Sequence, residues 1–387
     1  MDDLTAAGRA RIDEIVAAAV QSGQAPGVVS AIACGDTVHL STAGRLAVDG
    51  APVRADSLFR IASITKPMTA AVVCALVEDG LLRFGDTVDA LLPELADRQV
   101  LRRPDGPLDD TEPARGPVTV RDLLTFTWGF GMQGAMFTAH EPWPIFTATQ
   151  ERELHTFGEP APGSTPDPDT WIARLGELPL VVQPGVKWLY QTGSQVLGVL
   201  VARAAGAPLE TVMRERLFAP LGMHDTAFHT EQVDRLASGY RLGADGTFQV
   251  TDEPTGQWSR PPAFADGGAG LLSTASDVLA FGRMLLRGGA GVLRPELVAE
   301  MVRPQLTVEQ RTNDWSGFDL LSGRNWGLGM SVLDDGSYSW DGGLGTAWTN
   351  VPDLDLTVVT LTQREWNQDG PPAVCDDVLT AARGAAR

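Results

Sequence analysis

Apolar residues in the first twenty positions recur at the spacing of one helical face. That face consists of Ile12, Ile15, Val16 and Val20. No basic leader precedes a continuous apolar stretch here, so the pattern predicts an amphipathic first helix and not a signal peptide. Two runs of strand-forming residues follow, 28–33 and 37–43, and the Gly35-Asp36 pair between them predicts a β-hairpin.

The next apolar pattern predicts a helix that begins near Ser63 and stops at Gly80. Its buried face consists of Met68, Ala71, Val72, Ala75 and Leu76. Pro67 then lies in the first turn, where its missing N–H costs little. Ser63 is therefore at the helix N-terminus, near the positive end of the helix dipole, and Lys66 follows about one turn later, which lets both side chains face one point.

The middle of the chain, from about residue 86 to 255, is predicted to consist mainly of helical segments and long loops. The stretch 126–146 is dense in Gly, Met, Phe and Trp, which suits either a buried irregular loop or the rim or lid of a pocket. Helices are predicted again at 276–286, capped by Ser276 or Thr274, and at 372–386. Strand signals return at 326–333, 338–340, 347–351 and 356–362.

Strands at both ends of the chain, with helices between them, predict one sheet built from the two termini. The expected fold class is α/β, an antiparallel sheet flanked by helices plus a mainly helical insertion. We expect a discontinuous α/β domain from residues 1–85 and 256–387 and a mainly helical domain from 86–255. The active site is expected at their interface.

Composition and charge narrow the partners. With 43% hydrophobic and 20% charged residues the chain is an ordinary globular protein. Its net charge of −19 argues against nucleic acid or an anionic membrane as a partner, and no run approaches the roughly eighteen apolar residues of a membrane span. Cys34, Cys74 and Cys375 are far apart in apolar surroundings, which predicts buried free thiols and a cytoplasmic protein.

A rare lysine marks the candidate chemistry. Of the 30 basic residues only Lys66 and Lys187 are lysines, and Lys66 stands in Ser63-Ile64-Thr65-Lys66. A chance Ser-x-x-Lys is expected about 0.08 times in this composition. Arginine stays protonated at any working pH, whereas a desolvated lysine can lose its proton and act as a base. The motif therefore indicates a serine nucleophile beside an amine.

The other nucleophile and base candidates are weaker. The Gly-x-Ser-x-Gly elbow is absent, Cys74 falls on a mid-helix face, and the five histidines lack metal-ligand spacing, so no metal or organic cofactor is expected. A phenol would help relay the serine proton, which directs attention to Tyr190 in a turn before an apolar helix. A core tyrosine at a helix start is the competing interpretation.

A glycine-rich strand end supplies the third element, in Trp340-Asp341-Gly342-Gly343-Leu344-Gly345. Glycines beside a strand let a substrate carbonyl approach main-chain N–H groups closely. An oxyanion hole from the N–H groups of Ser63 and Leu344 would follow, with Gly343 beside them. Alone, a Gly-Gly pair is usually just a turn.

Together these segments resemble the serine β-lactamase and penicillin-binding-protein superfamily. The similarity runs from about Ala25 to Arg364 and is greatest to class C β-lactamases, family VIII carboxylesterases and related acyltransferases. It is carried by the stretches 58–66, 118–125, 220–226 and 267–274. The resemblance implies that Ser63 is acylated, that Lys66 activates it and that Tyr190 serves as base or acid. Which of Lys66 and Tyr190 carries the proton is left open.

Two departures from the family pattern bear on the substrate. The Tyr-x-Asn motif is here Tyr190-Gln191-Thr192, and the Lys-Thr-Gly motif aligns with Asp341-Gly342-Gly343. An acid in place of that lysine would repel a carboxylate-bearing substrate by about 1 kcal/mol or more. Both departures favour a neutral ester. The tryptophans proposed as walls of an apolar acyl pocket, each with a core position as the alternative, are Trp128, Trp143, Trp340 and Trp348.

Three functions stay open at this level. The favoured one is a serine esterase or acyltransferase that acts on a small-molecule ester. The second is a D-amino-acid amidase, peptidase or weak β-lactamase on the same fold, and the third is a non-catalytic binding protein that kept the scaffold. The sequence does not indicate an oligomeric state, nor the identity of the acyl and leaving groups.

Overall fold

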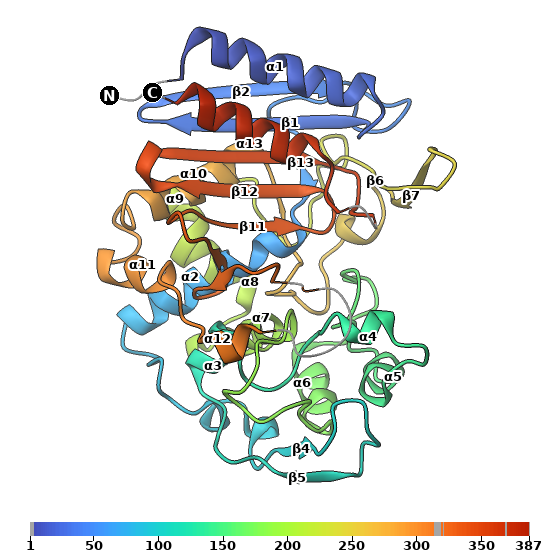
Figure 1. The fold of residues 1–387 in the computed structure, drawn as a ribbon, viewed down its shortest axis with the longest axis vertical. Coiled ribbons are helices and arrows are strands. Elements are labelled where there is room, and N and C mark those ends of the chain that lie inside the picture. Colours follow the sequence, from blue (N-terminus) through green and yellow to red (C-terminus); the bar gives the residue numbers. More distant parts are fainter. Residues whose placement is uncertain (1–3, 313–318, 320, 368–369, 387) are drawn as a thin grey trace.

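A seven-stranded antiparallel sheet organises the upper half of the molecule (Figure 1). The computed structural model describes residues 4–312, 319, 321–367 and 370–386. In spatial order the strands are β2 (Thr37–Gly44), β1 (Gly27–Cys34), β13 (Leu356–Thr362), β12 (Thr346–Val351), β11 (Tyr338–Gly342), β10 (Ser331–Val332) and β9 (Asn325–Trp326). The N-terminal hairpin pairs with the C-terminal strands, as the sequence predicts.

The central strands are buried on both faces. Every residue of β1 and of β13 is buried, and Val29 pairs with Leu361 across them. β2, at the edge of the sheet, instead alternates between exposed and partly buried positions. A strand whose residues are all apolar or small can be covered on both sides, which requires helices above and below the sheet.

Helices supply both covers. α1 (Ala6–Gln21) and α13 (Val374–Ala385) lie side by side on one face, where Ile12, Val16 and Val378 form a core with β1. α10 (Ala275–Leu286), capped by Thr274, and α2 (Thr65–Glu78) lie on the other face, over a larger core that continues into the lower half. The predicted helices over these stretches are confirmed.

The lower half contains short helices and loops, again as predicted. Its elements are α3 (Val120–Leu124), α4 (Ala135–Thr138), α5 (Pro144–Glu151), α6 (Pro168–Gly176), α7 (Thr192–Ala205) and α8 (Leu209–Met213). One hairpin, β4–β5 (Gln99–Leu101 and Thr111–Pro113), stands among them, whereas a second, β6–β7 (Gly239–Leu242 and Phe248–Asp252), lies beside the sheet in the upper half (Figure 1). The remaining elements are β3 (Phe59–Arg60), α9 (Ala219–Leu221), β8 (Leu272–Ser273), α11 (Pro295–Met301) and α12 (Val308–Arg311). α2 packs directly against α7, so the two predicted domains are in contact. The predicted domain limits stay a prediction.

The predicted strand at 326–333 is wrong in its middle. It divides into β9 and β10 because Gly329 has φ 78° and turns the chain toward α2. A side chain at this position would come within 2.6 Å of the Ala70 Cβ. The Gly329 N–H donates to the Leu124 carbonyl, so the interruption ties the sheet edge to the helical half.

The cysteine prediction is confirmed, since Cys34, Cys74 and Cys375 are buried free thiols. As for membrane spans, no single helix in the described residues is long and apolar enough to cross a bilayer. A bent pair, Thr192–Ala205 with Leu209–Leu221, passes by length and composition alone.

Truncating the sheet core should destabilise the fold far more than truncating its edge. Leu361 is fully buried on β13, whereas Leu40 on β2 is 41% exposed. Leu361→Ala should lower the free energy of unfolding by roughly 2–5 kcal/mol, and Leu40→Ala by under about 1 kcal/mol. Urea unfolding followed by far-UV circular dichroism measures both. Equal losses would contradict the central place of β13.

Candidate active site

Ser63 lies in a 3₁₀ turn, Ala62–Ile64, that leads directly into α2. Ala62 has φ 44°, a left-handed conformation that is unfavourable for alanine. The turn is held from both sides, because the Ile61 N–H donates to the Leu271 carbonyl and Thr346 Oγ1 donates to the Ile61 carbonyl. The predicted helix therefore starts with a tight turn that presents the serine.

Lys66 is completely buried, one turn after Ser63. Its Nζ lies 2.8 Å from Ser63 Oγ and donates to the Gly268 carbonyl at 2.7 Å. Burial lowers the pKa of this amine to about 7, against an opposing effect from the negative charge of Asp266. The neutral amine is thus available near neutral pH.

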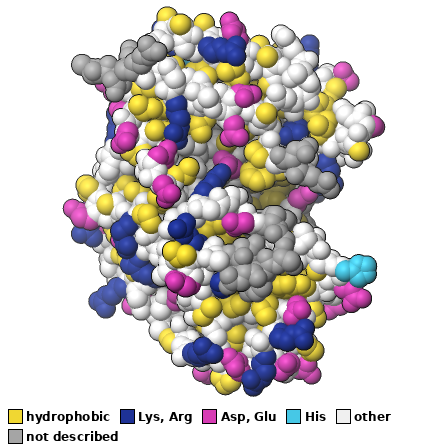
Figure 2. All heavy atoms as spheres, viewed as in Figure 1, with side chains coloured by type: hydrophobic (Ala, Val, Ile, Leu, Met, Phe, Trp, Pro, Cys, Tyr) yellow, Lys and Arg dark blue, Asp and Glu magenta, His cyan; other side chains and the backbone are white. Residues whose placement is uncertain are grey.

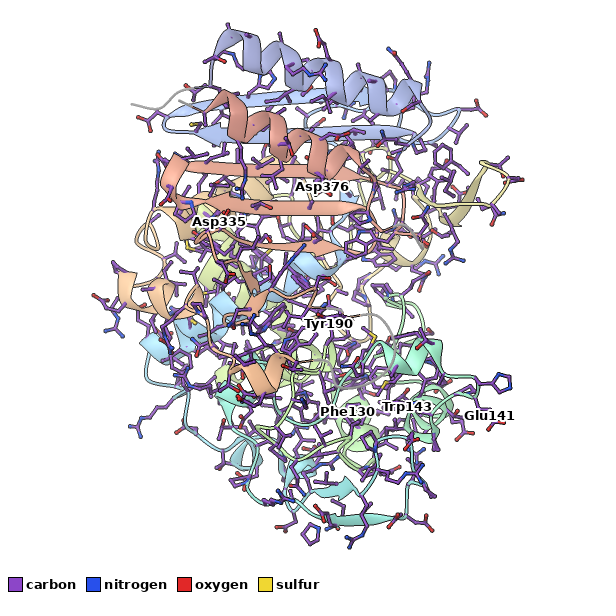
Figure 3. The ribbon with its side chains drawn as sticks, viewed as in Figure 1. Phe130, Glu141, Trp143, Tyr190, Asp335 and Asp376 are labelled. Carbon is purple, nitrogen blue, oxygen red and sulfur yellow. The ribbon has the colours of Figure 1, made fainter. Side chains whose placement is uncertain are left out.

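Tyr190 completes the group from the helical half of the molecule, and Figure 3 labels it between the two halves. Its OH lies 2.9 Å from Ser63 Oγ and accepts a hydrogen bond of 2.9 Å from Trp340 Nε1. Burial raises the pKa of this phenol above its ordinary value. Main-chain hydrogen bonds in both directions between Tyr190 and Met132 hold the segment in place just before α7.

Aromatic rings fix the orientation of Tyr190. Trp188 stacks on it at 5.6 Å between ring centroids, Trp340 lies at 5.5 Å and Phe126 at 6.0 Å. Trp326 in turn meets Trp340 edge-on at 4.7 Å. Such packing leaves the phenol little freedom, so its OH stays directed at the serine.

The end of β11 lies against the segment that leads into Ser63. A side chain at Gly342 would come within 2.3 Å of the Ile61 carbonyl. The Gly342 carbonyl accepts from Gly345 in the turn to β12, and in a trans peptide the next N–H points the opposite way. The Gly343 N–H is therefore directed to the open edge of the sheet, since the pairing of β11 with β10 ends at Ser339.

The side chain of Leu344 faces away from Ser63, and the proposed role of its main-chain N–H stays a prediction. Its side chain packs on the apolar group of Leu58, Trp258 and Leu272. It also lines a pocket on that side, together with Arg60 and Trp258, and this pocket does not include Ser63, Lys66 or Tyr190. Of the two candidates, Gly343 has its N–H directed to the open edge.

Asp341 faces away from the site, and its interpretation as an acid that meets the substrate is wrong. Neighbouring strand residues point to opposite faces, so Trp340 reaches Tyr190 while Asp341 points toward α13. There it lines a cavity with Arg324 and with Asp376, which Figure 3 labels on α13. Burial raises its pKa to about 6. The position on the Tyr190 side of β11 is thus held by Trp340, one residue earlier than aligned.

Three further residues are core and not pocket wall. Trp128 is fully buried beside Phe130, and Trp348 is fully buried beside Phe281 of α10. Thr192 is also fully buried, with its hydroxyl 2.6 Å from that of Thr156. Of the four tryptophans proposed for an acyl pocket, Trp340 contacts the site. Figure 2 shows a hollow with apolar side chains between the two halves on its right side.

Sequence reasoning missed the buried polar groups behind Lys66. Asp266 Oδ1 accepts the Gly268 N–H at 2.6 Å, and its Oδ2 accepts from Gln195 Nε2 at 3.1 Å. Gln195 Oε1 then accepts from Thr156 Oγ1. Asp266 precedes a Gly-Gly pair, a sequence signal for close packing. No sequence pattern, however, indicates that it lies behind Lys66, 200 positions earlier in the chain. Trp188 did carry one, because it lies two residues before Tyr190.

Comparisons with known proteins identify the family and the fold. The family model "Beta-lactamase" matches residues 12–374. Esterase EstB of Burkholderia gladioli is 31% identical over 94% of this chain and 92% of its own. Protein Rv1367c of Mycobacterium tuberculosis is 38% identical over 81% and 79%.

A solved structure shares the fold. It is EstCE1, described as a hydrolase with promiscuous acyltransferase activity, with a TM-score of 0.82 at 23% identity over 97% of this chain and 98% of that one. The antiparallel sheet flanked by helices is therefore the β-lactamase/transpeptidase-like fold. The chain belongs to the beta-lactamase family and is one of its serine hydrolases.

Proposed function

We propose that this protein hydrolyses neutral small-molecule esters through an acyl-enzyme on Ser63. One observation carries the proposal: a buried lysine amine and a partly buried phenol both lie within hydrogen-bond distance of Ser63 Oγ. A serine hydroxyl is a weak nucleophile until a neighbouring group takes its proton. The printed name of EstB, an esterase, agrees with this substrate class.

The protonation states suggest how the two groups divide the work. A phenol whose pKa is raised stays protonated at neutral pH, so Tyr190 donates to Ser63 Oγ. The pKa of Lys66, about 7, leaves a neutral amine whose lone pair can accept the Ser63 proton. In this assignment Lys66 is the base and Tyr190 is the acid.

The proposed acylation is balanced in atoms and charge. Ser63 Oγ attacks the ester carbonyl and its proton passes to Lys66 Nζ. The carbonyl becomes an oxyanion, held by the N–H groups of Ser63 and Gly343. When the C–O bond to the alcohol breaks, Tyr190 gives its proton to the leaving oxygen and is reprotonated by the Lys66 ammonium.

Deacylation repeats this route with water. Water attacks the acyl carbonyl and its proton passes to Lys66 Nζ. When the C–O bond to Ser63 breaks, the Lys66 ammonium returns that proton to Ser63 Oγ, which regenerates the neutral amine. An alcohol in place of water would give acyl transfer by the same steps. Measuring ester products in the presence of an added alcohol separates the two outcomes.

The cytoplasmic location remains a prediction.

Trp340 supports a neutral substrate. Its indole occupies the position that faces Tyr190, and a cation there would be needed to attract a substrate carboxylate. An indole supplies one N–H donor and no charge. A site built in this way has no evident means of holding the carboxylate of a β-lactam, so the β-lactamase alternative is not favoured.

Removing the nucleophile should abolish turnover. Ser63→Ala should lower kcat/KM for p-nitrophenyl butyrate on the order of 10³-fold or more, because no acyl-enzyme can form. Ser30→Ala, at a fully buried serine of β1, is the matched control and should keep most activity. Spectrophotometric hydrolysis assays measure both, and parent-like activity of Ser63→Ala would refute the proposal.

The pH profile should show an acidic limb. Below about pH 7 the Lys66 amine is protonated and cannot accept the serine proton, so kcat/KM should fall tenfold per pH unit on that side. Above pH 7 the amine is neutral and the rate should level off. Initial rates with an ester whose own hydrolysis is corrected at each pH measure the limb. A flat profile from pH 5 to 8 would exclude Lys66 as the base.

Trp340 should matter through its N–H as well as its ring. Trp340→Phe keeps an aromatic side chain but removes the donor to Tyr190, so kcat should fall roughly tenfold while KM for a neutral ester changes little. Trp348→Phe, on the opposite end of the same cross-strand pair but buried against α10, is the control. Equal kinetic effects in both variants would show that only stability had changed.

A further inference from the structure

A carboxylate lies buried behind the catalytic amine and takes no part in the steps above. Asp266 is 8% exposed, and burial raises its pKa. Both of its oxygens are engaged, by the Gly268 N–H and by the Gln195 amide. A buried carboxylate is costly unless it is compensated, so its presence here requires a compensating interaction.

The Gly268 peptide links this carboxylate to Lys66. Its N–H donates to Asp266 and its carbonyl accepts from Lys66 Nζ at 2.7 Å. A side chain at Gly268 would approach Asp266 Oδ1 and Gln195 Cγ to within 3.2 Å, which shows how closely the loop is held. The direction of the carbonyl that anchors the amine is therefore set from behind by Asp266.

The same carboxylate is tied to the element that carries the phenol. Gln195 belongs to α7, which begins two residues after Tyr190, and Thr156 joins it to Thr192 at the start of that helix. The chain of hydrogen bonds thus runs from the Lys66 anchor to the base of the Tyr190 segment. Moving one end would disturb the other.

The charges around the amine are few. Among the described residues, the titratable groups that face Lys66 Nζ are Asp266, from the loop after β7, and Tyr190, whose ring centroid lies at 4.8 Å. The two groups that the amine contacts directly, the Ser63 hydroxyl and the Gly268 carbonyl, are uncharged. Asp266 is therefore the negative charge that opposes the loss of the lysine proton.

We propose that Asp266 is a positioning residue for the acylation step, which aims the Gly268 carbonyl at Lys66 and places a buried negative charge behind that carbonyl. It touches no reacting atom. The inference rests on the proposed role of Lys66 as the base, yet it concerns a property of the resting protein. It can therefore be tested without substrate.

The scarcity of lysine makes a direct test possible. Protein labelled with ¹³C at lysine Cε contains two such lysines, Lys66 and Lys187, and Lys187→Arg assigns them. Asp266→Asn keeps an oxygen acceptor for Gly268 but removes the charge. The Lys66 titration should then move about one pH unit or more to lower pH, while Lys187 stays unchanged.

Kinetics give a second readout. In Asp266→Asn the acidic limb of kcat/KM should move to lower pH with the amine, and kcat should fall about tenfold because a weaker base accepts the proton. KM for the ester should change little. Asp266→Glu keeps the charge and should leave the limb near its parent position.

Asp277→Asn is the matched control. Asp277 is also 8% exposed and accepts from the Asp225 N–H and Thr226 Oγ1, with no contact to the catalytic group. It should lower stability without moving either titration. A Lys66 titration unchanged in Asp266→Asn, or moved equally in Asp277→Asn, would overturn the inference.

Folding and function are kept separate in this design. If Asp266→Asn does not fold, Asp266→Glu still tests the proposal. This variant keeps the charge, so an acidic limb of kcat/KM that moved by about one pH unit or more would contradict it. If Ser63→Ala keeps full activity, the proposed function fails while the Lys66 titration still reports on Asp266.

Discussion

The proposed chemistry of this molecule depends on the burial of one lysine amine, that of Lys66. An ammonium ion excluded from water is unfavourable, so burial lowers the pKa of Lys66. The amine contacts one carbonyl and one hydroxyl, and the Asp266 carboxylate lies behind that carbonyl. Without that burial the amine would be protonated at neutral pH and of no use as a base. Burying the amine lowers the stability of the folded protein, and the large hydrophobic core on which α2 packs offsets this loss.

The sheet and the helical half each contribute what the other lacks. The sheet half brings the serine on the 3₁₀ turn before α2, the lysine on α2 and the indole on β11, and the segment before α7 brings the phenol. Their meeting point is stiff because it is lined by aromatic rings and held by main-chain hydrogen bonds between Tyr190 and Met132. A rigid support is what allows two proton-transfer groups to stay within hydrogen-bond distance of one oxygen.

The proposed preference for neutral esters rests on which face of β11 meets Tyr190. Because side chains alternate along β11, the acid next to the indole is turned toward α13 and has no access to the substrate. An aromatic donor then stands where a cation would be needed for carboxylate substrates. In the proposed site, Asp341 facing the substrate would repel a carboxylate, whereas Trp340 in that place only fails to attract one.

The sequence by itself determined many of the local elements and selected the side chains that the structure brings together around Ser63. Apolar spacing predicted the terminal hairpin, α1, α2, α10 and the order of the C-terminal strands, since each pattern is read within a few neighbouring residues. The rare lysine three positions after Ser63 indicated the proposed catalytic pair in the same way.

Only the tertiary structure decided which face of β11 meets the site, that Trp128 and Trp348 lie in the core, and that Asp266 stands behind Lys66. These facts depend on contacts between residues some 60 to 200 positions apart, and no local periodicity encodes them. The physical reason is that burial and the direction of a peptide group are properties of the packed chain.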